Sequence, residues 1–230
     1  QSACGRGAGL CEGQARVVTF RAHVVLCLCL GASQALAGAQ REEPLVDAVR
    51  NALSAAVAQQ GPPQPVHSAA FSEQAYVRWL QHSEAQLQKF LKRRDAQAHE
   101  LSQAALRLEF LQTVWYESQR AGLDPSLVLG LIQVESGFRK FAISTAGARG
   151  YMQVMPFWTR VLSDGDAGAL FQMQVNLCFG CVNLRHYLNL EQGDLTLALG
   201  RYNGSRGQLP YPSAVMSAHK QWVLPEASQR

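Results

Sequence analysis

A carboxylic acid on an apolar helical stripe, Glu135, is the residue of this sequence best suited to acid–base chemistry. Val128, Leu131 and Ile132 precede it at helical spacing, so its side chain is predicted to face the core. An isolated carboxyl group among apolar neighbours is costly to ionise, and its pKa should rise. A carboxyl group that keeps its proton near neutral pH can act as a general acid. Taken alone, however, a Glu near a helix C-terminus is more often a partly exposed or hydrogen-bonded side chain.

The stretch 124–156 must position this acid. Asp124 can cap a helix and Pro125 suits its first position, and Gly137 offers a stop after Glu135. A loop of small residues and then a second helix are expected to follow. The remaining patterns after residue 40 are also helical, and no strand pattern is convincing. The predicted fold is therefore mostly α.

Three short blocks carry the polar residues that could serve the acid. In chain order they are Glu135-Ser136-Gly137, then Ser144 with the run Gly147 to Pro156, then Arg201-Tyr202-Asn203-Gly204. They resemble the consensus blocks of the soluble lytic transglycosylase (SLT-type) family, a branch of the lysozyme-like superfamily. The resemblance covers about residues 105–220. Asn176-Leu177 with Gly180, and Tyr211-Pro212 with Val215, are similar to further parts of that family's pattern.

The resemblance implies an enzyme that cleaves the β-1,4 bond between N-acetylmuramic acid and N-acetylglucosamine in peptidoglycan. Glu135 would protonate the leaving oxygen and then act as base toward the muramyl C6 hydroxyl, which closes a 1,6-anhydro ring. No cofactor and no metal are implied. Most glycosidases use two carboxylates, but between Glu135 and Glu191 the only other acids are Asp164 and Asp166, in one polar turn. That scarcity fits a single acid working with an internal nucleophile.

Further roles follow from the resemblance residue by residue. Positions that match the sugar-binding site are Ser144, Gln153 and Met155, and the hydroxyl of Tyr202 would orient the catalytic carboxylate. Asn203 is grouped with these substrate-binding positions, although support of the turn is the stronger interpretation. Two residues depart from the family: Tyr151 replaces the usual Leu and could stack on a sugar, and Arg201 replaces the usual Ala.

Two cysteines, Cys178 and Cys181, lie outside the N-terminal region. Their spacing places both on one face of a helix, where an oxidising compartment could bridge them as a disulfide. The stronger interpretation is that they are two small buried hydrophobic side chains. A metal or redox site is the weakest interpretation, because no second pair completes it.

The first 39 residues have the features of an export signal. Arg16 and Arg21 precede the apolar run 24–30, and small residues with an A-x-A pattern allow cleavage after Ala37 or Ala39. A buried helix is the alternative, and the first fifteen residues could lie upstream of the true start. We therefore predict a signal peptide and a periplasmic protein.

Four parts are predicted along the chain: the signal peptide with an upstream extension at 1–39, an Ala/Gln-rich segment with a Pro-rich linker at 40–67, an amphipathic helical segment at 68–104, and the lysozyme-like domain at 105–224. The net charge is +4, with 21 basic and 17 acidic residues. Without residues 1–39, which hold three Arg and one Glu, 18 basic and 16 acidic residues remain. This balance argues against a nucleic-acid partner.

Two alternatives to a lytic transglycosylase stay open. One is a goose-type lysozyme-like hydrolase, which would leave reducing ends. The other is a catalytically inactive wall-binding module, such as an accessory of a secretion machine. The expected partner is the peptidoglycan glycan strand in each case, with a cell-wall or secretion-machinery protein as a further candidate partner.

Overall fold

A computed structural model of the chain describes residues 40–45, 47–58, 73–93 and 100–225. The chain divides into two units, residues 1–32 and 33–230, and every described residue belongs to the second. The predicted signal peptide and the Pro-rich linker lie outside the described residues. The domain boundary predicted at residue 105 stays a prediction.

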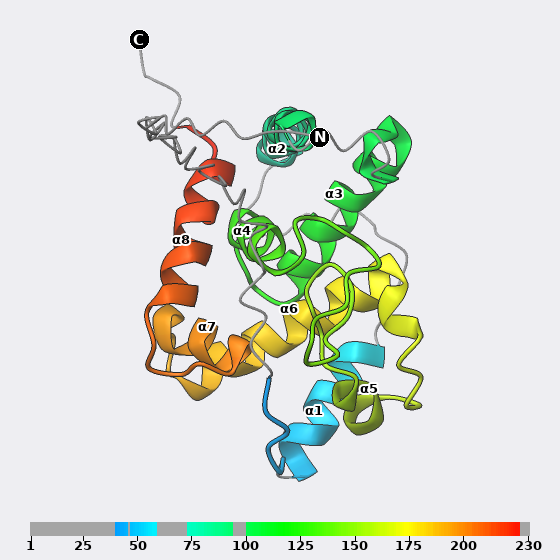
Figure 1. Cartoon of the computed structure of the whole chain (residues 1–230), viewed down its shortest axis with the longest axis vertical. Helices are drawn as coiled ribbons and strands as arrows, with labels where there is room; N and C mark the ends of the chain where they lie inside the picture. The colour runs from blue at the N-terminus through cyan, green and yellow to red at the C-terminus, as the bar shows by residue number, and fades with distance from the viewer. Residues whose placement is uncertain (1–39, 46, 59–72, 94–99, 226–230) are drawn as a thin grey trace, which may run out of the picture. The chain divides into compact units, whose positions relative to one another are not determined.

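The described part is built from helices, as the sequence predicted (Figure 1). Isolated bridges pair Ile143 with Arg149 and Arg149 with Val154, and no longer strand occurs within these ranges. The helices are α1 Asp47–Ala58, α2 Glu73–Arg93, α3 Ala104–Arg120, α4 Pro125–Glu135, α5 Phe157–Leu162, α6 Met173–Leu190, α7 Leu195–Asn203 and α8 Pro210–Trp222, with the 3-10 turns η1 Glu100–Ser102 and η2 Ala169–Phe171.

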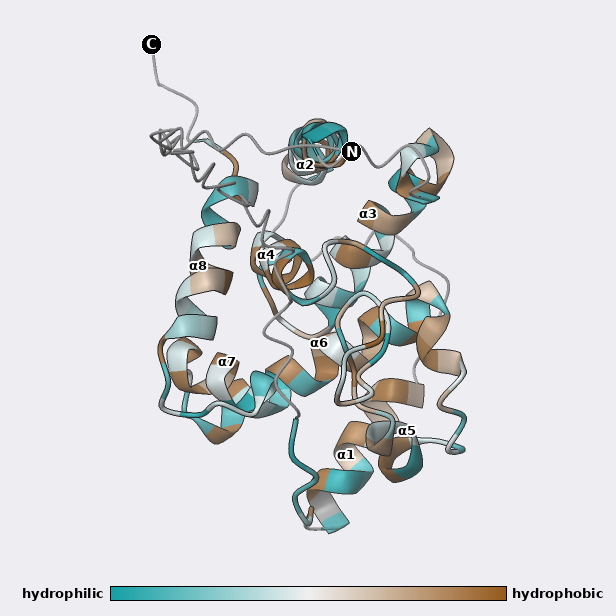
Figure 2. Cartoon of the chain, in the orientation of Figure 1, coloured by the Kyte–Doolittle hydropathy of each residue, from teal (hydrophilic) through white to brown (hydrophobic). Residues whose placement is uncertain are grey.

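Helix α4 lies between α8 and α3 and is apolar over most of its length (Figures 1 and 2). Every residue of α4 except Gln133 and Val134 is buried. Helix α8 packs closely because Gly130 has no side chain: a Cβ there would lie 2.6 Å from the backbone nitrogen of His219. This close approach brings the N-terminal turn of α8 to the end of α4 that carries Glu135.

Both ends of α4 follow the sequence prediction. The carboxylate of Asp124 accepts a hydrogen bond from the backbone N–H of Ser126 at 2.9 Å, and Pro125 is the first helical residue. At the other end, Gly137 has a φ of +58°, a left-handed conformation that suits glycine and ends the helix after Glu135. The acid therefore sits at the junction of the helix and the following loop.

The loop 136–156 is longer than expected, because the second helix starts only at Phe157. Gly150 and Gln153 have φ values of +76° and +49°, which a right-handed helix does not allow. Asn176 of α6 holds this part of the loop: its side-chain oxygen accepts from the N–H of Met152 at 2.8 Å, and its amide donates to the carbonyl of Arg149 at 2.9 Å. The resemblance of Asn176 to a family position thus has a structural reason.

The amphipathic helical segment predicted at residues 68–104 contains α2 and η1, and α3 begins at its end, at Ala104. Helix α2 buries Trp79, Ser83, Leu87 and Leu91, which recur every four residues and form one face. The indole of Trp79 lies 5.0 Å from that of Trp115 in α3. The sequence left open whether this segment binds the catalytic domain or another protein; in the structure α2 packs on α3 and α8.

The segment before α1 is anchored by side chains as well. The amide oxygen of Gln40 accepts a hydrogen bond from the indole of Trp158 at 2.8 Å, and Glu43 pairs with Arg201 at 3.3 Å. Trp158 is itself buried and belongs to the core. Helix α1 packs against α5 and α6.

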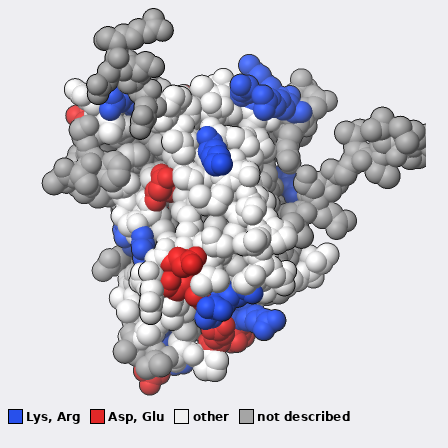
Figure 3. Space-filling view, turned by 90° about the vertical axis from the view of Figure 1, so that its left-hand side faces the viewer, with Lys and Arg blue, Asp and Glu red and all other residues white. Residues whose placement is uncertain are grey.

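Charge is mixed over the surface that carries α7 and α8 (Figure 3). Acidic and basic side chains gather together in the lower part of this face, and large areas are uncharged. Mixed charge of this kind does not form the basic patch of a nucleic-acid-binding surface. None of the described helices is both long and apolar enough to span a membrane.

Candidate active site

The carboxyl group of Glu135 is almost fully enclosed, with 4% of the residue exposed. Burial raises its pKa from 4.5 to about 8, because the charged form loses its hydration. The phenol of Tyr211 donates to Oε1 of Glu135 at 2.5 Å and opposes that rise. No cation pairs with Glu135 among the described residues. The predicted burial of this acid is confirmed.

Tyr211 is the partner of Glu135 that the sequence analysis missed. It stands in the first turn of α8 and is itself buried. Burial, and then the negative charge of Glu135, raise the pKa of Tyr211, so its hydroxyl remains a donor. The Tyr211-Pro212 pair was noticed as part of a family pattern, but its approach to the acid depends on the packing of α8 against α4.

The role expected for Tyr202 is corrected. Its hydroxyl donates to the backbone carbonyl of Met152 at 2.8 Å, and therefore does not orient Glu135. Burial raises the pKa of Tyr202, and the charge of Glu135 adds to that rise. Through this hydrogen bond, Tyr202 connects α7 to Met152 in the second sequence block.

Ser144 and Gln153 lie in the loop that follows Glu135, and both stabilise it. The hydroxyl oxygen of Ser144 accepts from the N–H of Ala148 at 3.0 Å. The buried amide of Gln153 donates to the carbonyls of Ala142 and Gly150, at 3.1 and 2.9 Å. The Ser144 O–H has no acceptor among the described residues and can donate to a ligand. The sugar contacts of both residues remain proposals.

The other predicted substrate-binding residues are more enclosed than expected. Met155 is half-buried against the core. The amide of Asn203 donates to the hydroxyl of Ser205 at 2.9 Å, which fits the support of a turn. Tyr151 is only 1% exposed, and its hydroxyl donates to Glu100. The expectation that Tyr151 stacks on a sugar is therefore wrong, because its ring is covered by protein.

The disulfide considered for Cys178 and Cys181 is not formed. Both are free thiols on the buried side of α6. The guanidinium Nη2 of Arg120 donates to Sγ of Cys178 at 3.0 Å, and burial raises the pKa of this thiol to about 12. A thiol that resists ionisation inside a core is a poor partner for oxidation. Core packing is the correct interpretation.

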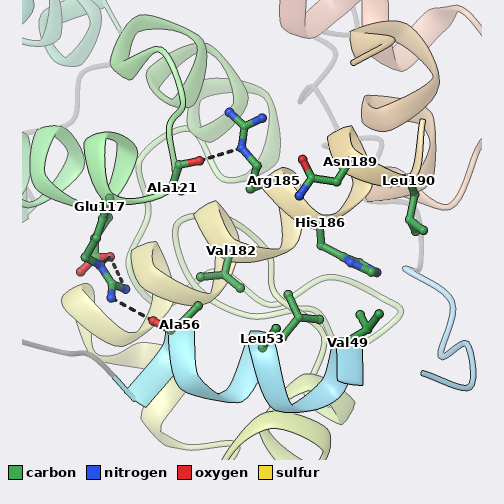
Figure 4. A pocket seen from close by; sticks show the side chains of 12 residues that line it. Val49, Leu53, Ala56, Glu117, Ala121, Val182, Arg185, His186, Asn189 and Leu190 are labelled. Atoms are coloured by element: carbon green, nitrogen blue, oxygen red, sulfur yellow. Dashed lines mark hydrogen bonds and ion pairs between the residues drawn. The ribbon is translucent and has the colours of Figure 1, made fainter. Parts of the chain in front are cut away.

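A second buried acid, Glu117, provides a comparison with Glu135. Glu117 lines a cavity of about 550 Å³ between α1, α3 and α6 (Figure 4). Nε of Arg120 donates to its carboxylate at 3.0 Å, so the charge is compensated by a neighbour on the same helix. Burial raises the pKa of Glu117, but Arg120 opposes the rise. Glu135 has no such partner and is the better general acid.

Residues 112–221 match the family described as the transglycosylase SLT domain. This part of the chain belongs to that family. The matched range contains Glu135, both tyrosines near it and all of the sequence blocks. No group of three or more His, Cys, Asp or Glu side chains that could hold a metal occurs in the described ranges.

Two relatives illustrate how far the similarity to known proteins extends. The transglycosylase of Enterobacteria phage PRD1 is 33% identical over 116 residues, which cover 47% of this chain and 42% of the phage protein. The membrane-bound lytic murein transglycosylase C of Mannheimia succiniciproducens is 50% identical over 48 residues, 21% of this chain and 13% of that protein. The chain therefore spans less than half the length of these relatives.

Proposed function

We propose that this protein is a lytic transglycosylase that cleaves the bond between N-acetylmuramic acid and N-acetylglucosamine in peptidoglycan without water. The observation that carries the proposal is Glu135 itself: a buried carboxyl group with a pKa of about 8 and no cationic partner in the described residues, within an SLT domain. Such a group is protonated at neutral pH and can donate its proton.

In the proposed first step, Glu135 transfers its proton to the glycosidic oxygen as the bond to the muramyl C1 breaks. The N-acetylglucosamine part leaves with that proton as a hydroxyl group, and Glu135 becomes a carboxylate. Burial makes this carboxylate a strong base, and the hydrogen bond from Tyr211 stabilises it.

In the second step, the carboxylate of Glu135 takes the proton of the muramyl C6 hydroxyl. The C6 oxygen then bonds to C1 and closes the 1,6-anhydro ring, while Glu135 returns to its protonated form. One carboxyl group serves as acid and as base, and the substrate supplies the nucleophile. The mechanism requires no water, metal or cofactor.

The other acids of the domain support a single-acid mechanism. Glu191 is bound by Arg201 and Arg206, which hold its pKa at about 2, so it carries a fixed charge. Asp164 and Asp166 accept hydrogen bonds from backbone N–H groups of their own exposed turn. None of these carboxylates is placed in an apolar environment like that of Glu135.

The proposed setting is the periplasm, with export directed by residues 1–39 and glycan strands as the substrate. Relatives whose names describe membrane-bound murein transglycosylases support this setting. A protein of the cell wall or of a secretion machine remains a candidate partner.

The decisive test is a digest of purified peptidoglycan analysed by mass spectrometry, with Glu135→Gln as the control. Wild type should release anhydro-muropeptides and the variant should release almost none. Products with reducing ends alone would identify a goose-type hydrolase instead. Equal digestion by wild type and Glu135→Gln would contradict the catalytic role of Glu135. No digestion by either would favour an inactive wall-binding module.

A further inference from the structure

Glu100 lies in the 3-10 turn η1, before the range that matches the SLT family, yet it contacts the loop that follows Glu135. Its Oε1 accepts a hydrogen bond from the buried hydroxyl of Tyr151. Its Oε2 lies 3.9 Å from the ammonium group of Lys140. One carboxylate therefore reaches residues near both ends of this loop.

The turn η1 is itself held firmly in place. Arg107 is buried, and its Nη1 donates to the carbonyls of Leu101 and Ser102 at 3.0 and 3.1 Å. Its Nη2 donates to the carboxylate of Glu84 in α2 at 3.1 Å. Arg107 thus connects α2, α3 and η1, and these contacts fix the backbone of the turn that carries Glu100.

The loop needs such support because it contains strained residues. Phe138 and Gln153 have left-handed φ values of +67° and +49°, which side chains other than glycine rarely adopt. The ring of Phe138 is fully buried and lies 5.1 Å from Phe90 and 6.0 Å from Phe110, both of which precede the matched range. Residues before the SLT domain therefore hold the strained residue that follows the acid.

A short path leads from Glu100 to the site. Tyr151 is next in sequence to Met152, whose carbonyl accepts the hydrogen bond from Tyr202. The same loop begins directly after Glu135, at Ser136, and continues to the start of α5 at Phe157. If Tyr151 moved, Met152 and its hydrogen bond to Tyr202 would move with it, and the loop that follows Glu135 would lose its fixed conformation.

We infer that Glu100 is a positioning residue for Glu135, acting through Tyr151 to fix the loop that follows the acid. The inference rests on the proposed function in that Glu135 is the general acid. It also explains why Tyr stands where the family usually has Leu: the hydroxyl matches a carboxylate that a segment outside the matched range supplies.

The test compares Glu100→Ala, Tyr151→Phe and the double variant with wild type. Each single variant should lower kcat by about tenfold, the loss expected for one hydrogen bond to a charged group, and should leave KM nearly unchanged. The double variant should be no worse than either single one, because both remove the same bond. Glu100→Gln keeps an acceptor for Tyr151 and should retain most of the activity.

Glu109→Ala is the matched control for charge alone: it removes an exposed carboxylate of the adjacent helix whose charge also raises the pKa of Tyr151, but which makes no side-chain hydrogen bond in the described part of the chain. It should leave kcat unchanged. A second readout does not depend on activity: the pKa of Glu135, followed by NMR of the labelled carboxyl carbon, should fall toward its ordinary value in Glu100→Ala and in Tyr151→Phe, but not in Glu109→Ala.

The outcomes separate this inference from the proposed function. An active wild type with Glu100→Ala matching Glu109→Ala, in kcat and in the pKa of Glu135, would overturn the positioning role alone. A wild type that releases no anhydro products would overturn the proposed function, and the NMR titration would still decide whether Glu100 controls the environment of Glu135. A Tyr151→Phe protein with the wild-type pKa for Glu135 would also refute the inference.

Discussion

Replacement of Glu135 by Gln should stabilise the folded protein increasingly as the pH rises. The folded chain keeps Glu135 protonated up to a pKa of about 8, whereas the unfolded chain ionises it near 4.5. Between these values the native state binds one more proton, so the stability of the wild type falls as the pH increases. The protonated side chain of Glu135 makes its full contribution to the stability of the folded protein below pH 4.5, and this contribution is lost as the pH rises through 8. A Gln side chain does not titrate, so it makes no pH-dependent contribution of this kind.

The magnitude follows from this window. Each pH unit in which the two states differ by one proton changes the free energy of unfolding by about 1.4 kcal/mol. From 4.5 to about 8, the advantage of Glu135→Gln over wild type should therefore grow by roughly 5 kcal/mol. Gln has a similar shape, and its side-chain oxygen can still accept the hydrogen bond from Tyr211, so little else should change with pH.

Urea unfolding of both proteins at pH 5, 6, 7 and 8 measures this difference directly. Other titrating groups are common to both proteins and cancel in the comparison. Glu109→Gln, which alters an exposed side chain of α3, should show no growing difference. If the gap between Glu135→Gln and wild type stays constant over this range, Glu135 is not held neutral by burial, and the argument for its acidity fails.

Three other changes should have distinct effects. Tyr211→Phe removes the hydrogen bond that lowers the pKa of Glu135, so the basic limb of the kcat profile should move to higher pH and kcat should fall about tenfold; an unchanged profile would exclude a role for Tyr211. Cys178 and Cys181 are buried free thiols, so a reductant should not alter the melting temperature and a thiol reagent should not label the native protein; rapid labelling would contradict this. Phe141 is 69% exposed, so its ring buries little apolar surface and Phe141→Ala should leave the melting temperature nearly unchanged; a large loss of stability would contradict this.

Local patterns were sufficient to predict the helix that carries the acid. The cap at Asp124, the apolar spacing up to Glu135 and the stop at Gly137 are each encoded within a few residues, and local signals of this kind are readable from sequence. The burial of Glu135 followed from the same spacing.

Contacts between distant segments could not be predicted in the same way. Whether Tyr202 or Tyr211 reaches Glu135 depends on how closely α8 packs at Gly130, which no local pattern specifies. The pairing of Tyr151 with Glu100 joins residues 51 positions apart. Both corrections concern tyrosines whose hydroxyl groups needed a partner inside the protein, and that partner was supplied by tertiary structure.

The other enclosed or interacting acids of the domain show why Glu135 can act as a general acid. Glu117 pairs with an arginine of its own helix, Glu191 is bound by two arginines, and Asp124 lies 2.8 Å from a histidine nitrogen. Within the described residues, Glu135 accepts a side-chain hydrogen bond only from the neutral hydroxyl of Tyr211. A cation beside it would favour the charged form and lower its pKa. The chemistry of the site thus depends as much on keeping positive charge away from one carboxyl group as on burying it.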